Sequence, residues 1–401
     1  MRREVEALLD RGHEVDLICL RRKGEVGRER WRGVQIYRMP LQHRRGGTLG
    51  YVLEYGLFFG MAMVAASVLH LRRRYRLVQV NTMPDALVWA AWLPRMMGAR
   101  VLLDFHELMP ELYASKFASG LSHPLPRLLA WIETKAAGWA DACLAVSEPC
   151  LDAYARRGAA RNRFTIVMNA ADPRLFASRE VDEEEKESGP IRIVSHGTLA
   201  SRYGFDLLIQ AMARIRDIEA GLDSDEDEAR LDSDAELGVD GSQGEASMVL
   251  EILGEGDARS ELEMLIETLE LQGRVTLSGF VPLDQVASRI STADIGVVAN
   301  RSDPFTDLVV PTKLMEYVSL GIPSIAARTP AVEAYFDEEM VRFFPPGDVD
   351  ALADALRIMK ADSELRARLA EGAKRFVTMH GWPVQAERYV GLVEALASNP
   401  R

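Results

Sequence analysis

The chain has 401 residues, of which 48% are apolar and 27% charged. This composition excludes a wholly disordered protein, and the length is more than one ordinary core requires, so two domains are expected. The formal net charge is 48 − 60 = −12, but the acidic residues are concentrated in residues 180–187 and 219–245, and residues 1–170 carry 25 Lys and Arg against 16 Asp and Glu. This basic first half suits an anionic ligand or an anionic membrane face, and equally a simple solvated surface.

The first half alternates helical and strand patterns, as a parallel sheet with crossover helices requires. Helices are predicted over 2–11, 51–71, 83–98, 124–140 and 148–158, and strands over 13–20, 33–40, 75–81, 99–107, 141–147 and 163–170. Cys19, Cys143 and Cys150 show no metal-binding or redox spacing, so a reducing cytoplasm is the simplest setting.

The segment 51–71 is apolar and is followed at once by "RRRYR". It is long enough to cross a membrane, but it contains Glu54, two glycines and many small residues. We expect a buried or interfacial helix here rather than a membrane span.

The second half repeats the same alternation. Strands are predicted over 191–197, 247–256, 274–280, 293–299 and 322–327, and helices over 204–218, 257–273, 282–292 and 311–321. The expected organisation is a first domain over 1–171, an acidic linker over 172–190 and a second domain over 191–380. A disordered acidic insertion is expected at 219–246, and a last helix within 381–401 is expected to cross back to the first domain.

The chain opens on a helix, whereas a doubly wound domain normally opens on a strand in the middle of its sheet. A missing central strand would leave two neighbouring strands without ladder partners. We therefore expect the first strand of the N-terminal domain, with its phosphate-facing turn, to be missing from this sequence.

Polar residues follow several predicted strands, at the edge where ligands of open parallel sheets bind. In the first half these are Asn81 and the "DFHE" stretch with His106 and Glu107. In the second half they are "SHGTLASR", which contains Gly197 and Thr198, and "LGEG", which begins its turn at Gly254. The grouping of polar residues after a strand favours a functional His106 over a purely structural one.

Two cationic residues stand at predicted helix starts. Arg202 precedes the helix at 204–218, and "PTKLMEY" places Thr312 and Lys313 in a first turn with Glu316 on the same face. Alone, Arg202 could be merely solvated and the Lys–Glu pair a surface ion pair. Together, the two helix starts favour a diphosphate site, because the first-turn N–H groups and a nearby cation bind phosphate. No pair of acidic residues suited to a nucleotide-bound metal is present outside the acidic insertion, so metal dependence is not expected.

The order of these motifs over nearly the whole chain resembles glycosyltransferase family 4, the retaining sugar transferases of the GT-B fold. The resemblance runs from "RREVEALLDRGHEVDLI" through "VMNAADPRLF", "SHGTLASRYGFDLLIQA" and "VTLSGFVPLDQV" to "PTKLMEYVSLGIPSIA". It implies an α/β protein with two Rossmann-like doubly wound domains facing a cleft. The implied activity is transfer of a hexose from a nucleoside diphosphate sugar to an acceptor hydroxyl, without a metal or other cofactor, in polysaccharide or glycolipid synthesis.

The resemblance also implies roles for particular residues. Arg202 and Lys313 would hold the donor diphosphate, Glu316 would contact the nucleotide ribose, and His106 would approach the transferred sugar. Gly197 would let its loop close over the donor. Position 308 is Leu308 where the family has a first Glu, so Asp307 is expected to substitute for it; Thr198, Thr312 and Gly254 complete the expected donor site, and Asn81 and Glu107 the acceptor side.

Two other functions stay open on the sequence. One is a nucleotide-sugar epimerase of the same fold, and the other is a non-catalytic homologue that binds nucleotide. The expected partners are the nucleotide-sugar donor, a saccharide or lipid-linked saccharide acceptor and an anionic membrane surface, but not nucleic acid. The expected location is the cytoplasm, peripheral to the inner membrane face.

Overall fold

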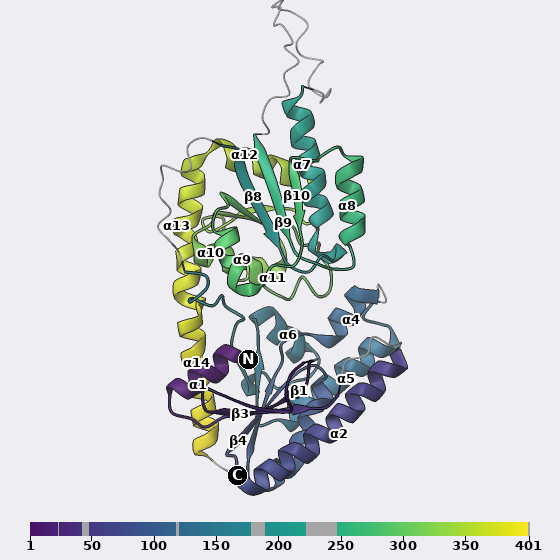
Figure 1. Cartoon of the computed structure of the whole chain (residues 1–401), viewed down its shortest axis with the longest axis vertical. Helices are drawn as coiled ribbons and strands as arrows, with labels where there is room; N and C mark the ends of the chain where they lie inside the picture. Colours follow the sequence, from purple (N-terminus) through teal and green to yellow (C-terminus); the bar gives the residue numbers. More distant parts are fainter. Residues whose placement is uncertain (23, 42–47, 118–119, 178–188, 222–246, 400–401) are drawn as a thin grey trace, which may run out of the picture. The chain divides into compact units, whose positions relative to one another are not determined.

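The structure, a computed structural model, describes residues 1–22, 24–41, 48–117, 120–177, 189–221 and 247–399. The chain divides into two compact units, shown in Figure 1. Unit 1 comprises Met1–Asn169 and Trp382–Arg401, and unit 2 comprises Ala170–Gly381. Most of the expected acidic linker and most of the expected insertion at 219–246 lie outside the described residues.

Unit 1 contains two separate sheets, with strand orders β1-β3-β2 and β4-β5-β6-β7. Every pairing is parallel except that of β2 with β3. Among the described residues, β1 and β4 each pair on one side only. The strands are β1 (Asp16–Leu20), β2 (Arg28–Trp31), β3 (Val34–Met39), β4 (Leu77–Asn81), β5 (Arg100–Asp104), β6 (Ala142–Ala145) and β7 (Phe164–Ile166).

Helices cover the sheets of unit 1. They are α1 (Arg2–Asp10), α2 (Thr48–Arg73), the 3₁₀ helix η1 (Asp85–Ala91), α3 (Trp92–Met96), α4 (Met109–Phe117), α5 (Pro124–Trp139), α6 (Glu148–Arg156), the 3₁₀ turn η2 (Arg161–Arg163) and α14 (Trp382–Ser398). The last helix, α14, packs on α1 and on the second sheet, where Tyr389, Val390 and Val393 join Leu8 and Leu102 in one hydrophobic cluster. The two ends of the chain therefore build the same core.

Three elements of unit 1 differ from the sequence-based prediction. The helix expected over 83–98 is a 3₁₀ helix followed by the short α3. Pro94 explains part of this difference, because its ring nitrogen cannot donate to residue 90 and its ring crowds that carbonyl. The antiparallel strand β2 and the helix α4 were not predicted; β2 is exposed apart from Trp31, so it lacks the apolar pattern of a core strand.

Unit 2 is one parallel sheet of order β10-β9-β8-β11-β12-β13. Its strands are β8 (Ile191–His196), β9 (Met248–Leu253), β10 (Val275–Ser278), β11 (Ile295–Val298), β12 (Ser324–Ala327) and β13 (Arg342–Phe344). Every residue of β11 and β12 is buried, as expected for central strands covered by helices on both faces.

The helices of unit 2 follow its strands. They are the 3₁₀ turn η4 (Ser201–Tyr203), α7 (Phe205–Glu219), α8 (Arg259–Thr268), α9 (Leu283–Ile290), α10 (Thr312–Leu320), α11 (Pro330–Glu333), α12 (Val349–Ala361) and α13 (Ser363–His380). Asp348 and Asp362 cap α12 and α13 by accepting from the amides of Ala351 and Leu365. The predicted class, an α/β protein with two Rossmann-like units, is confirmed.

The chain order of unit 2 reverses at β8, which lies between β9 and β11. In open parallel sheets this reversal leaves a space beyond the carboxyl ends of the strands, and ligands bind there. The residues that follow β8, β9 and β11 are therefore expected to form the ligand site of unit 2.

Candidate active site

The loops after β8 and β9 in unit 2 touch through their backbones. The amide of Gly197 donates to the carbonyl of Leu253, and the amide of Leu199 donates to the carbonyl of Glu255. Gly254 has a φ of +154°, and a methyl group there would lie 1.9 Å from the carbonyl oxygen of Gly197. Only glycine allows this approach, so the sequence element "LGEG" is explained by the packing of two loops.

The loop after β11 joins the same group. Arg301 forms a bidentate ion pair with Asp206 in the first turn of α7, with distances of 2.8 and 2.6 Å. Its amide also donates to the carbonyl of Arg202. This anchor was not predicted from the sequence, because nothing local relates two residues so far apart in the chain.

The two predicted phosphate-binding cations lie against one aromatic ring. The guanidinium carbon of Arg202 is 5.5 Å from the centre of the Tyr203 ring, and Nζ of Lys313 is 5.4 Å from it. Lys313 also lies 4.6 Å from the ring centre of Phe205. The structure therefore brings together the start of α7 and the start of α10, as the sequence predicted.

Lys313 is unusual because it is a buried cation. It is only 7% exposed, and its Nζ has no hydrogen-bond partner among the described residues. Burial lowers the pKa of Lys313 to about 7, and the negative charge of Glu316 partly offsets this by raising it. Among the described residues, no side chain caps the first amides of α7 or α10, so these N-terminal amides remain suited to an anion.

Glu316 is held by a residue that sequence reasoning did not single out. Nε2 of His196, the last residue of β8, lies 2.6 Å from Oε2 of Glu316, and Nδ1 lies 3.0 Å from the Tyr317 hydroxyl. The Tyr317 ring in turn packs against β11, where a methyl group on Gly296 would be 2.6 Å from it. The only sequence signal for His196 was its place at the end of a predicted strand.

The remaining residues of the predicted donor site lie around this group. Gly197 and Thr198 are exposed after β8, and Thr312 is exposed as the first residue of α10. Asp307 lies in the segment leading to α10, where its carboxylate accepts from the Ser302 hydroxyl at 2.8 Å. Burial and the charge of Asp303 raise the pKa of Asp307, and the Ser302 bond opposes that rise.

In unit 1, the predicted acceptor-side residues meet at the ends of β4 and β5. Asn81 and Asp104 are register partners, and Nδ2 of Asn81 donates to Oδ2 of Asp104 at 2.8 Å. Nε2 of His106 lies 2.9 Å from the same oxygen. Burial lowers the pKa of His106, but the hydrogen bond and charge of Asp104 raise it more, so the net shift is upward. Glu107, the next residue, is half-buried.

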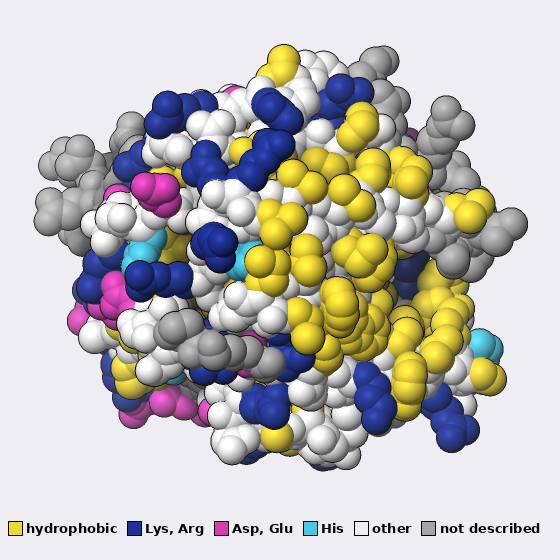
Figure 2. Space-filling view, turned by 90° about the horizontal axis from the view of Figure 1, so that it is seen from below, with side chains coloured by type: hydrophobic (Ala, Val, Ile, Leu, Met, Phe, Trp, Pro, Cys, Tyr) yellow, Lys and Arg dark blue, Asp and Glu magenta, His cyan; other side chains and the backbone are white. Residues whose placement is uncertain are grey.

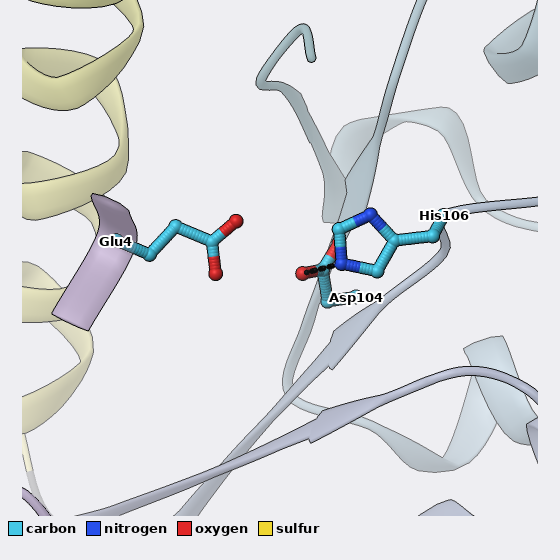
Figure 3. A group of neighbouring side chains, drawn as sticks. All are labelled: Glu4, Asp104 and His106. Atoms are coloured by element: carbon cyan, nitrogen blue, oxygen red, sulfur yellow. Dashed lines mark ion pairs between the residues drawn. The ribbon is translucent and has the colours of Figure 1, made fainter. Parts of the chain in front are cut away.

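Glu4 of α1 points toward the Asp104–His106 pair (Figure 3). The ligand atoms of Glu4, Asp104 and His106 lie within 4.8 Å of one another, a spacing that could hold a cation. However, Gln79 donates to both carboxylates at 3.1 and 3.3 Å, and Asp104 also accepts from Asn81 and His106. These N–H donors occupy Oδ2 of Asp104 and Oε2 of Glu4, so the group is best explained as a hydrogen-bond network.

Known proteins match both units. A model described as "Glycosyl transferase 4-like domain" matches residues 1–170, and one described as "Glycosyl transferases group 1" matches residues 177–376. A lipopolysaccharide core biosynthesis glycosyltransferase of Rhizobium meliloti is 23% identical over 341 residues, which is 84% of this chain and 81% of that protein. A putative colanic acid biosynthesis glycosyltransferase of Escherichia coli is 22% identical over 54% of this chain and 47% of its own length.

Solved structures agree on the fold. Sucrose-phosphate synthase from Thermosynechococcus elongatus has a TM-score of 0.74 at 21% identity, covering 99% of this chain and 92% of that chain. HepE of Anabaena, solved in complex with UDP, has a TM-score of 0.65 at 14% identity, covering 96% of this chain and 100% of that chain.

The fold and the matches define the class: a glycosyltransferase with the GT-B fold. The chain belongs to the group 1 glycosyltransferases. Nothing among these relatives favours the epimerase alternative.

Proposed function

We propose that this glycosyltransferase moves a sugar from a nucleoside diphosphate sugar to the hydroxyl of a saccharide or lipid-linked saccharide, with retention at the anomeric carbon and without a metal. The observation that carries the proposal is the buried Lys313 at the start of α10: its Nζ has no hydrogen-bond partner among the described residues, and it shares the Tyr203 ring with Arg202. A buried cation without an anion is costly to the fold unless a ligand compensates for it. A diphosphate supplies that compensation, and a fold neighbour was solved with UDP bound.

The proposed reaction breaks the bond between the anomeric carbon and the β-phosphate oxygen, and the bonding pair leaves with the nucleoside diphosphate. The acceptor oxygen forms its bond on the same face, and its proton passes to the leaving phosphate. Arg202 and Lys313 stabilise the charge that develops on that phosphate. Glu316, held by His196, contacts the ribose, and His106 approaches the transferred sugar.

The acceptor is proposed from the chemistry of relatives. The related proteins of Rhizobium meliloti and Escherichia coli are described as acting in lipopolysaccharide core and colanic acid biosynthesis. A saccharide carried by a lipid, presented at the inner membrane face, is the acceptor class that fits these relatives and the basic first half of the chain.

The proposal is tested by binding and then by turnover. Screening nucleotide sugars for thermal stabilisation should identify the donor, because a ligand that binds the native state raises its stability by mass action. With that donor, Lys313→Ala or Arg202→Ala should lower turnover about a hundredfold. Lys374→Ala, at an exposed lysine of α13, is the matched control and should change nothing.

Two results would contradict the proposal. A Lys313→Ala protein with near-normal turnover would refute the diphosphate site. A protein that binds no nucleoside diphosphate would refute the transfer reaction itself, and an isomerised donor formed without acceptor would favour the epimerase.

A further inference from the structure

The outer face of α2 carries a stripe of large apolar side chains. Leu53, Leu57, Val64, Val68 and Leu71 are between 41% and 66% exposed. At 100° per residue these five positions fall within a sector of about 60° on the helix. A surface helix of a water-soluble domain normally turns its apolar stripe toward the core. Here an apolar stripe faces outward.

Neighbouring helices extend this apolar surface. Trp92 and Met96 of α3 are 54% and 67% exposed, and Leu128 and Trp131 of α5 are 51% and 58% exposed. The helix α3 packs beside α2, and α5 packs on η1, which also contacts α2. Figure 2 shows hydrophobic side chains gathered over a broad part of one face. An apolar surface of this extent marks a site of interaction.

Most of the exposed charged residues around this face are basic; the exposed Glu14 lies 4.0 Å from Arg73, which also pairs with Asp16 at 3.3 Å. Exposed basic side chains on α2, α5 and the turn after α2 are Arg72, Arg73, Arg74, Arg76, Arg127 and Lys135. Among the described residues of α2, η1, α3 and α5, no acidic side chain is exposed: Glu54 is partly buried, and Asp85 and Glu133 are buried. The predominance of Arg72, Arg74, Arg76, Arg127 and Lys135 favours a partner that is apolar at its centre and anionic at its edge.

We infer that this face of α2, α3 and α5 docks on a bilayer containing anionic phospholipid, inserting its apolar side chains and placing its arginines among the headgroups. Tryptophans beside an apolar stripe with flanking Arg and Lys are typical of the membrane interface. A second copy of this chain is a poorer partner, because a symmetric contact would set these basic residues against each other. This face is the surface that would meet a lipid-linked acceptor. Only that role rests on the proposed function; the docking on the bilayer does not.

The fold favours a helix that lies on the bilayer. By length and composition alone, Leu53–Arg73 could cross a membrane. However, its inner side packs on η1 and α3, and Ala62, Leu69 and His70 are buried there. Crossing would require α2 to leave these contacts, so docking along the interface is the arrangement consistent with the folded unit.

Co-sedimentation of the full chain with vesicles tests the inference. Vesicles of phosphatidylcholine with about one third phosphatidylglycerol should bind the protein at low salt, whereas phosphatidylcholine alone should bind it much more weakly. Val64→Asp should lower the partition coefficient at least tenfold. Arg72→Gln and Arg76→Gln should each lower it roughly fivefold and reduce its salt dependence. Met264→Asp and Arg192→Gln, at exposed positions of unit 2, should leave binding unchanged.

Tryptophan fluorescence tests the orientation. Bromine-labelled lipid chains should quench the bound protein, and Trp92→Phe or Trp131→Phe should reduce the quenched fraction. Nucleotide affinity and circular dichroism should be unchanged in every variant, which shows that each still folds. The docking surface is refuted if vesicle binding does not depend on lipid charge, or if Val64→Asp binds vesicles as well as the parent protein. It is also refuted if Val64→Asp converts a dimer into a monomer without affecting vesicle binding.

Vesicle binding is measured without donor or acceptor, so it can fail separately from the transfer reaction. A protein that binds vesicles but transfers no sugar refutes the proposed function and keeps the docking surface. A protein that transfers sugar to a soluble acceptor but does not bind anionic vesicles refutes the docking surface and keeps the proposed function.

Discussion

At the scale of single residues, burial decides the chemistry of Lys313. An exposed lysine keeps its charge well above neutral pH, but burial lowers the pKa of Lys313 to about 7. The charged groups near it are Glu316, which raises that pKa, and Arg202, which shares the Tyr203 ring. We therefore expect anion binding to favour the charged form of Lys313.

This burial predicts a pH dependence of donor binding. Below a pH of about 7, Lys313 is already charged and binding takes up no proton. Above it, the free protein holds a neutral lysine that must be protonated to bind the diphosphate, so affinity should fall by up to tenfold per pH unit. Isothermal titration of the nucleotide sugar across this range measures the slope. Lys313→Met should bind weakly with a flat profile, and an unchanged slope in that variant would assign the titration to another group.

His196 is predicted to act through Glu316. The imidazole fixes one carboxylate oxygen at 2.6 Å and leaves the other for the proposed ribose contact. We expect His196→Leu to weaken nucleotide binding about tenfold, the usual worth of a hydrogen bond to a charged group. The affinity for a nucleotide lacking the ribose hydroxyls should change much less.

A double-mutant cycle separates positioning from general damage. If His196 acts through the carboxylate, His196→Leu should add little once Glu316→Ala is present. His196→Gln, which can still donate a hydrogen bond, should recover part of the loss. Additive effects of the two substitutions would show that His196 supports the fold rather than Glu316.

At the scale of elements, glycines let the loops of unit 2 pack backbone to backbone. Gly204 caps α7 with a φ of +63°, and a methyl group there would lie 1.9 Å from the carbonyl oxygen of Ala299. That contact joins the loop after β8 to the end of β11. The position of Arg202 therefore depends on Gly204, because only a residue without a side chain allows this close approach.

Gly204→Ala should destabilise unit 2 by about 3 kcal/mol or more, because left-handed strain and a backbone clash add. Gly347→Ala is the matched control: its φ is +85°, but nothing lies within 4 Å of the added methyl group. It should cost only about 1 kcal/mol. Urea unfolding of the two variants, each with its m-value, checks the difference, and equal losses would contradict the packing explanation.

At the scale of the whole molecule, the C-terminal helix α14 belongs to the core of unit 1. Tyr389 is buried among residues of β5 and β6, and its hydroxyl donates to Gln79 of β4 at 2.6 Å. The amide of Met168 likewise donates to Gln385 of α14 at 3.0 Å. The stability of the first unit thus depends on the last residues of the chain.

Tyr389→Ala should lower the stability of unit 1 by about 4 kcal/mol, the range for a buried aromatic side chain. Hydrogen exchange followed by peptide mass spectrometry should show faster exchange in β4 and β5 but not in β8 or β11. Arg388→Ala, at the exposed neighbour on the same helix, should leave both units unchanged. Faster exchange confined to unit 2 would contradict this assignment of α14.

The sequence by itself was sufficient for the fold class and for most of the elements. Apolar runs such as 293–299 and 322–327 predicted β11 and β12, because strands covered on both faces need continuous apolar residues. The helices that begin just after Arg202 and at Thr312 were also predicted from the sequence, whereas their use as a phosphate site stays a prediction.

Only the tertiary structure showed which side chains pair over long distances in the chain. His196 reaches Glu316 across 120 positions of the chain, and Arg301 reaches Asp206 across 95; no local pattern encodes such pairs. The short α3, the exposed β2 and the outward apolar stripe of α2 likewise depend on what packs beside them. Local sequence sets periodicity and turn chemistry, whereas the burial that lowers the pKa of Lys313 exists only once distant strands bring Tyr203 and Phe205 around it.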